Sequence, residues 1–217
     1  MAKPTGEGLI GSISFGGNFA DANFDANSTY AEMARRPLEA EQCALVVVDM
    51  QERLLPPIWE KQRLVRNVQL LIRLAGILKI PAIVTTQNAK GLGHTVPEIA
   101  SLLPESPSID KLMFSCFGSD VFCSLLKRLP GQRTTVLLCG METHICVMQT
   151  ALGLIEAGRR VWLVRDAVGS RRAESKETAI RRLERSGAEI VTTEMVIFEW
   201  VETAEHPRFR DALALVR

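Results

Sequence analysis

Several short, continuous apolar segments, each bounded by a polar or amphipathic stretch, place the strongest constraint on the fold of this chain. The clearest are CALVVVD at 43–49 and TTVLLCG at 134–140, which consist mainly of β-branched and aliphatic residues. Segments this short and this apolar are typical of strands buried on both faces, as in a parallel sheet. We therefore expect them to form the centre of a sheet that helices cover on both sides.

The same pattern extends along most of the chain. Further strands are predicted at 81–87, within 109–115, at 160–166 and at 188–193. Helices are predicted at 58–79, 119–129, 143–157 and 173–186, with one or two more at the C-terminus. Strands that alternate with helices of this length predict right-handed βαβ crossovers. The fold expected from the residues alone is a three-layer α/β/α domain with a mostly parallel sheet.

The first 38 residues differ in composition from the rest, and we interpret them as an N-terminal extension to a domain at 39–217. They are rich in Gly, Ala, Asn and Asp and have no sustained helical or strand period. If the extension is ordered, Phe15, Phe19 and Phe24 are its expected anchors, with a neighbouring subunit as one docking surface. The stretch 88–108, rich in Gly and Pro, predicts a long loop with one short helix.

Charge and cysteine content argue against several classes of partner. A net charge of +1 gives no electrostatic reason to expect nucleic acid or an anionic membrane. The apolar runs are far shorter than the ~20 residues of a membrane span, and no secretory signal opens the sequence. Five cysteines without a CxxC pair are typical of reduced thiols. We therefore expect a cytoplasmic protein.

Three chemically useful side chains lie at predicted strand ends. Asp49 closes the first strand, Lys111 lies in the short one, and Cys146 follows the strand at 134–140 in the first turn of a helix. Ligands of open parallel sheets bind beyond the carboxyl ends of the strands, so we expect these three groups at one edge. Each also has a structural interpretation: Asp49 as a helix cap, Lys111 as a surface residue and Cys146 as part of the core.

An acid, a cation and a thiol together have the chemistry of acyl transfer. A thiol must ionise to attack, and free cysteine has a pKa near ~8.5. The helix start and Lys111 favour the thiolate, whereas an ionised Asp49 opposes it. A carboxylate within reach accepts the thiol proton and returns it to the leaving group. Backbone N–H groups between Gly140 and Cys146 would bind an oxyanion, so the pattern predicts hydrolysis of an amide or related bond through a thioester.

Three motifs carry a resemblance to a known family. ALVVVDMQ, DKLMFSCF and GMETHICVMQTA, within about 42–195, resemble the isochorismatase-like cysteine hydrolases. The resemblance implies a Rossmann-like sheet of about six strands and a catalytic triad, which falls on Asp49, Lys111 and Cys146. It also implies a non-proline cis peptide at Met141–Glu142, which would turn the Glu142 N–H toward the pocket of Cys146.

The resemblance also bears on the pocket and on metals. Gln87 and Phe117 are the predicted pocket residues; the structural alternative for Gln87 is an amide that satisfies backbone groups. Nicotinamidases of this family carry an Asp and histidines after the second strand to hold a metal, whereas that stretch here holds only His94. We therefore expect no metal and no cofactor. His144 is interpreted as a helix-start residue rather than a base, because Asp49 fills that role.

Two functional hypotheses follow. The first is a metal-independent cysteine hydrolase of a C–N bond in a small molecule, with Cys146 as nucleophile, Asp49 as general base and acid, and Lys111 as electrostatic support. The second is a non-catalytic binding or scaffold protein of the same fold. KGLGHTVPE is similar to a subgroup with poorly defined substrates, some labelled ribonucleases. A homo-oligomer is expected, by resemblance and because the extension has little core of its own.

Overall fold

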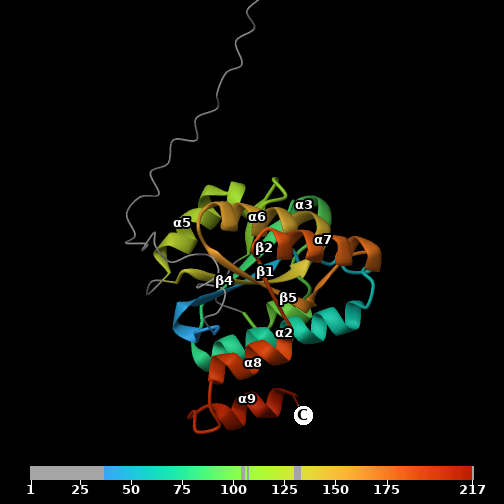
Figure 1. Ribbon diagram of the computed structural model, residues 1–217. Coiled ribbons are helices and arrows are strands. Elements are labelled where there is room, and N and C mark those ends of the chain that lie inside the picture. Colours follow the sequence, from blue (N-terminus) through green and yellow to red (C-terminus); the bar gives the residue numbers. More distant parts are fainter. Residues whose placement is uncertain (1–36, 104–105, 107, 130–132, 217) are drawn as a thin grey trace, which may run out of the picture.

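The computed structural model describes residues 37–103, 106, 108–129 and 133–216 (Figure 1). Its sheet has six strands in the order β3-β2-β1-β4-β5-β6, and every pairing between them is parallel. The strands are β1 (Cys43–Val48), β2 (Ala82–Gln87), β3 (Ile109–Lys111), β4 (Thr135–Met141), β5 (Arg160–Gly169) and β6 (Glu189–Val191). This arrangement confirms the predicted Rossmann-like α/β fold.

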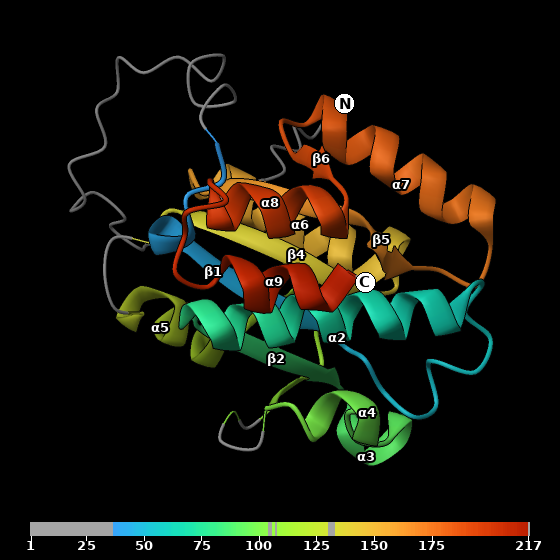
Figure 2. The same cartoon turned by 90° about the horizontal axis from the view of Figure 1, so that it is seen from below.

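Helices cover both faces of the sheet (Figures 1 and 2). One layer contains α2 (Lys61–Leu78), α8 (Thr193–Val201) and α9 (Phe209–Val216). The other contains α5 (Asp120–Arg128), α6 (Met148–Glu156) and α7 (Ala173–Arg185). The loop after β2 holds two short helices, α3 (Ala89–Leu92) and α4 (Pro97–Ala100), where one was predicted. Single turns are present at η1 (Ala40–Gln42), η2 (Cys116–Gly118) and η3 (Thr143–Val147).

The central strands β1 and β4 are buried along their whole length. Because alternate side chains of a strand point to opposite faces, each strand supplies two cores. Leu45 and Val47 of β1 pack in the cluster that contains residues of α2 and α8. Val46 and Val48 pack in the cluster that contains residues of α5, α6 and α7. This two-sided burial explains why the strand segments are continuously apolar rather than alternating.

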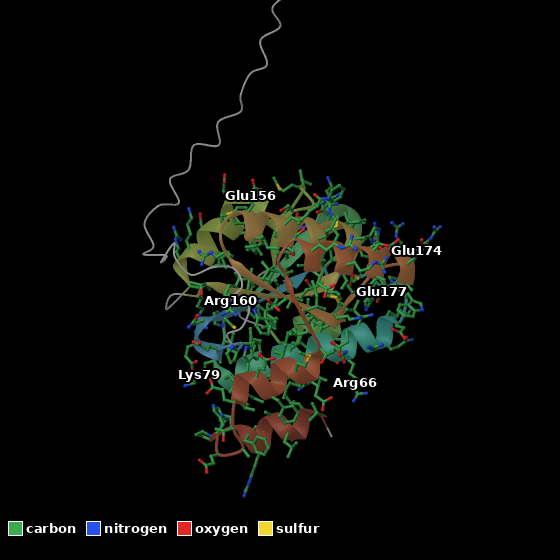
Figure 3. The ribbon with its side chains drawn as sticks, viewed as in Figure 1. Arg66, Lys79, Glu156, Arg160, Glu174 and Glu177 are labelled. Atoms are coloured by element: carbon green, nitrogen blue, oxygen red, sulfur yellow. The ribbon has the colours of Figure 1, made fainter. Side chains whose placement is uncertain are left out.

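Charged residues lie on the outer faces of the helices. Figure 3 shows Glu174 on the outer surface of α7 and Arg66 on the outer side of α2. Glu177 of α7 reaches toward the sheet, where it pairs with Arg165 of β5 at 2.8 Å. Among the described residues, the helices are too short or too polar to span a membrane.

Leu38, the last residue assigned to the N-terminal extension, contacts the domain core. The Leu38 side chain is fully buried in the α2 and α8 core, and its N–H donates to Glu199 of α8 at 3.0 Å. Leu38 therefore packs as part of the domain. Phe15, Phe19 and Phe24, the predicted anchors of the extension, lie outside the described residues.

The order of the strands fixes where a ligand site belongs. Strands β1 and β4 are neighbours, and the helices that follow them, α2 and α6, lie on opposite faces of the sheet (Figures 1 and 2). The connections after two such strands diverge and leave a crevice beyond their carboxyl ends. Asp49 follows β1, and Cys146 follows β4, so both residues lie at this point.

Candidate active site

A buried ion pair joins the ends of β1 and β3. Lys111 Nζ donates to Asp49 Oδ2 at 2.8 Å, and both side chains are completely buried. The other carboxylate oxygen, Oδ1, accepts a hydrogen bond from Thr85 Oγ1 at 2.7 Å. A charge removed from water is costly unless it is paired and hydrogen-bonded, and both oxygens of Asp49 meet this condition. The structure therefore brings together two of the three groups that the sequence places at strand ends.

Gln87 holds the lysine of this pair. Its Oε1 accepts from Lys111 Nζ at 3.0 Å, while its Nε2 donates to the Leu112 carbonyl at 2.6 Å. The Gln87 side chain therefore satisfies a backbone group, as its structural interpretation predicts, and also orients a charged side chain. Gln51 supports it from the loop after β1, because Gln51 Oε1 accepts the Gln87 backbone N–H at 2.7 Å. Sequence reasoning missed Thr85 and Gln51; the signal available was a polar residue inside or beside an otherwise apolar strand.

The backbone is unusual on both sides of the crevice. Asp49 has φ 49°, a left-handed conformation that non-glycine residues seldom adopt but Asp tolerates better than most. Gly140 has φ 109°, and a Cβ atom there would lie 2.1 Å from the Val48 carbonyl oxygen. Only glycine allows β4 to approach β1 this closely. Outliers of this kind concentrate at functional sites, and here they flank the strand ends that carry Asp49 and Cys146.

Cys146 lies on a tight turn between β4 and α6. The peptide bond Met141–Glu142 is cis, and the turn that follows, η3, is a π-type turn. The Glu142 carbonyl accepts from the N–H groups of Ile145 at 3.0 Å and of Val147 at 3.3 Å. The helix expected over 143–157 thus begins with this wider turn and becomes α-helical at Met148. The turn fixes Cys146 in the first residues after β4.

Burial dominates the environment of the Cys146 thiol. Its exposure is only 5 %, and burial raises its pKa above the ordinary value. The charge of Asp49 and a hydrogen bond to Asp49 raise the pKa further, whereas the charge of Lys111 lowers it. Burial and Asp49 thus disfavour the thiolate, and Lys111 favours it. Cys146 is also more enclosed than an open site would require, and it contributes to the core on the α6 side.

A second ion pair ties the Cys146 turn to the loop after β5. Glu142 Oε2 accepts from the backbone N–H of Arg171 at 3.1 Å and from its Nε at 3.0 Å. Beside it, His144 Nδ1 and Ser170 Oγ are 3.0 Å apart, and the Ser170 carbonyl accepts from the Trp59 N–H. Both contacts span the β4–α6 and β5–α7 connections. His144 thus joins two loops, and Arg171 and Ser170 are site residues that sequence reasoning missed.

Phe117 lies in η2, against α6. A Cβ atom on Gly153 of α6 would be 3.1 Å from the Phe117 Cβ, so the ring packs directly on that helix. The preceding residues Leu112, Met113 and Phe114 are strongly exposed although they are apolar. They follow Lys111 directly and form an apolar segment beside the buried ion pair. A short strand was predicted within 109–115, and in the structure it ends at Lys111, before these three residues.

Among the described residues, no group of three or more His, Cys, Asp and Glu side chains is arranged to hold a metal ion. His94, the only histidine near the family's metal position, lies between α3 and α4, where its backbone carbonyl accepts from the Glu52 N–H at 3.1 Å.

Comparison with known proteins places this geometry in a family. The model of the isochorismatase domain matches residues 43–195, which include β1, the Cys146 turn and β6. The chain belongs to the isochorismatase family. A curated family member, the secreted isochorismatase effector Isc1 of Phytophthora sojae, is 36% identical over 176 residues, which cover 80% of this chain and 83% of the relative.

Two solved structures resemble this chain closely in fold. The MAR1 ribonuclease of Caenorhabditis elegans is 36% identical, with a TM-score of 0.78 over 83% of this chain and 92% of the other. The YcaC gene product of Escherichia coli, an octameric hydrolase of unknown specificity, is 27% identical, with a TM-score of 0.74 over 83% and 87%. Family and neighbours together support a hydrolase function in general.

Proposed function

We propose that this isochorismatase-family chain is a metal-independent cysteine hydrolase that cleaves a C–N bond in a small amide. The observation that carries the proposal is the contact of the Cys146 thiol with an Asp49 carboxylate that Lys111, Thr85 and Gln87 hold in place. A thiol in the core has no need of a buried ion pair beside it. Such a pair is costly to build and is kept where chemistry requires it.

In the first half of the reaction, Asp49 takes the proton of Cys146 as the sulfur attacks the amide carbon. The S–C bond forms and the carbonyl π electrons move to oxygen. When the tetrahedral intermediate collapses, the C–N bond breaks and the amine leaves with the proton that Asp49 returns. A neutral resting thiol suits this route, because the base is already in contact with the proton it must accept.

In the second half, Asp49 acts as base again. It takes a proton from a water molecule that attacks the thioester carbon, the C–S bond breaks, and the sulfur recovers the proton as the carboxylic acid leaves. Lys111 compensates the carboxylate charge within the buried site throughout. The backbone N–H groups of Glu142 and Cys146 are the proposed donors to the oxyanion. Donors of this kind typically lower the activation free energy by about 3 kcal/mol each. Gln87 orients Lys111, and Phe117 is the proposed wall of the pocket on the α6 side.

The experiment is turnover of a panel of small amides by the wild type, Cys146→Ala and Cys123→Ala. Cys123 is the half-buried thiol of α5, so its removal is a matched control for loss of a cysteine. We expect Cys146→Ala to abolish activity and Cys123→Ala to retain it. Incubation with a chelator should leave the wild-type rate unchanged, and recovery by an added divalent ion after loss would overturn metal independence.

The alternative is a non-catalytic binding or scaffold protein of the same fold. Its support is the enclosure of Cys146, which is as buried as a core residue. If the folded protein hydrolyses none of the amides in the panel, the result supports the non-catalytic alternative. The name of the nematode relative suggests a test with RNA as well, although a net charge of +1 gives no support to a phosphate backbone as substrate.

We also propose a cytoplasmic homo-oligomer that acts without a nucleic acid or membrane partner. The octameric YcaC neighbour supports assembly, and the exposed apolar residues after β3 supply a surface that association would cover. Light scattering at micromolar concentration should give a mass above the 24.0 kDa of one chain. A monomeric mass would remove this proposal without affecting the chemistry.

A further inference from the structure

We infer that Cys116 is a positioning residue of the candidate active site, which ties the Asp49 carboxylate to the helical segment that carries Cys146. The inference rests on the proposed function, because it concerns how the base of that reaction is held in place. It is carried by a series of buried hydrogen bonds that runs from α6 through Cys116 to Asp49.

Cys116 makes one hydrogen bond toward α6 and one toward the base. Its backbone N–H donates to Thr150 Oγ1 of α6 at 2.9 Å. Its Sγ donates to Thr85 Oγ1 of β2 at 3.6 Å, and Thr85 Oγ1 donates in turn to Asp49 Oδ1 at 2.7 Å. Asp49 is hydrogen-bonded to the Cys146 thiol, and Cys146 lies four residues before Thr150. These five residues therefore form a ring of contacts that closes through the backbone of η3 and α6.

The side chains of this ring are removed from solvent. Asp49, Thr85, Cys116 and Thr150 are completely buried, and Cys146 is 5% exposed. A buried polar group that loses its partner is not rescued by bulk water, so the loss is costly. Each hydrogen bond in the ring thus restricts where the next side chain lies.

The thiol of Cys116 also sets the direction of the Thr85 hydroxyl. A hydroxyl has one proton to donate and lone pairs with which to accept. Because Cys116 Sγ donates to the Thr85 oxygen, the single hydroxyl proton is left for Asp49 Oδ1. Burial raises the pKa of the Cys116 thiol above the ordinary value, which favours the protonated form that donates. Lys111 holds the other carboxylate oxygen, so both oxygens of Asp49 are fixed beside the Cys146 thiol.

Packing alone is the competing explanation, because buried cysteines are common in cores. Cys116 does lie in the hydrophobic cluster that contains Cys146. Cys139 of β4 provides the contrast: it is equally buried, but its Sγ donates to the Val46 carbonyl at 3.7 Å and it packs in the cluster on the opposite face of the sheet. Cys139→Ala is therefore the matched control for loss of a buried thiol.

Alkylation of Cys146 by iodoacetamide tests the inference without knowledge of the substrate. An S–C bond forms, the C–I bond breaks, iodide leaves, and the thiol proton passes by way of Asp49 to the solvent. Peptide mapping gives the rate at Cys146 at neutral pH, and circular dichroism checks that each variant is folded. The variants are Cys116→Ala, Cys116→Ser, Thr85→Val, the double variant of Cys116→Ala with Thr85→Val, and Cys139→Ala.

We expect Cys116→Ala to slow the alkylation of Cys146 by about threefold, the size of one weak hydrogen bond, because the Thr85 hydroxyl is then free to turn away from the base. Cys116→Ser keeps a donor on a side chain of the same shape, so its rate should return to within about twofold of the wild type. The double variant should react at the rate of Thr85→Val alone, since Cys116 acts through Thr85, and Cys139→Ala should change the rate by less than about twofold.

The inference is wrong, and the hydrolase proposal stands, if wild-type Cys146 reacts but Cys116→Ala has the rate of Cys139→Ala. The same holds if serine does not restore the rate, or if the losses from Cys116→Ala and Thr85→Val multiply in the double variant, since either result is that of a packing residue. If wild-type Cys146 is inert until denaturation, the hydrolase proposal fails and the inference fails with it.

A second variant covers the case in which Cys116→Ala does not fold. Thr150→Val keeps the shape of the side chain but no longer accepts the Cys116 N–H. It should slow the alkylation of Cys146 by about threefold, because Cys116 is then no longer tied to α6. An unchanged rate in folded Thr150→Val would reject the inference.

Discussion

The candidate site contains two carboxylate–cation pairs at the same edge of the sheet, and they differ in almost every physical respect. Asp49 and Lys111 join the ends of β1 and β3, are fully buried and share hydrogen bonds with Thr85 and Gln87. Glu142 and Arg171 join two loops, and the cation of that pair is more than half exposed. The first pair is held by strands, and the second by connections between strands and helices.

This difference in burial implies a difference in how firmly each pair is held in place. A fully buried pair is rigid, because moving either partner leaves an uncompensated charge in the interior. That suits Asp49, which must stay in register with the Cys146 thiol. A pair on the surface of the site contributes little to stability but still sets the local charge. Replacement of Arg171 should therefore affect folding less than replacement of Lys111.

The largest expected effect is on stability. Lys111→Ala leaves the Asp49 carboxylate buried without its cation, and removal of one partner of a buried pair typically costs about 3–5 kcal/mol. Arg171→Ala removes a half-exposed cation and leaves the nearly buried Glu142 with the backbone N–H of residue 171 as donor, so a smaller loss of about 1–3 kcal/mol is expected. Denaturant unfolding of both variants measures the comparison directly. Equal losses of unfolding free energy in the two variants would show that burial does not distinguish the two pairs.

The next effect is on the reactivity of the thiols. At neutral pH, Cys146 should be the first cysteine alkylated by a small reagent, because Asp49 is in place to accept its proton. Lys111→Ala should slow this reaction by roughly tenfold, since the opposing carboxylate remains and the cation is lost. Peptide mapping of protein shown to be folded by circular dichroism provides the rates. Cys116 or Cys123 reacting first, with Cys146 inert until denaturation, would mark Cys146 as a core residue.

A smaller effect distinguishes two adjacent threonines of β2. Thr85→Val removes the hydrogen bond to Asp49 Oδ1 and leaves that buried oxygen with one donor fewer, at a cost of about 1–3 kcal/mol. Thr86→Val removes a bond to Asp110, whose side chain lies at an exposed position of β3, so it should cost less. The two variants are matched in shape and chain position. If Thr86→Val proves as costly as Thr85→Val, the support of Asp49 is not special.

The smallest effect is the dependence of stability on alkaline pH. Burial raises the pKa of the Cys146 thiol above the ordinary value of 9.0. The unfolded chain then loses this proton first, so the stability contributed below about pH 9 is lost as the pH rises further. The loss from this one thiol is on the order of 1 kcal/mol between pH 9 and pH 10. Thermal unfolding of the wild type and of Cys146→Ala at increasing pH should show that Tm falls less steeply with pH in the variant.

The positions of the strands and most helices follow from the sequence, because each short apolar run requires cover on two faces. Thus 43–49 and 134–140 are central strands in the structure as predicted, and the ends of these strands carry Asp49 and the turn to Cys146. The short strand at 109–111 likewise carries Lys111, and the family resemblance adds the cis bond at Met141–Glu142, which the structure contains. These features are local, or are repeated within a motif, and a sequence displays them.

The contacts that join distant segments were decided by the tertiary structure alone. Arg171 lies 29 positions from Glu142, and Thr85 lies 36 positions from Asp49. No periodicity connects residues so far apart, since their meeting depends on the strand order and on a shift in the pairing of β4 with β5. The balance of charge around Cys146 was equally hidden, because desolvation depends on everything that covers the thiol. The sequence thus determined which side chains reach the edge of the sheet, and packing determined which of them are paired, buried and neutral.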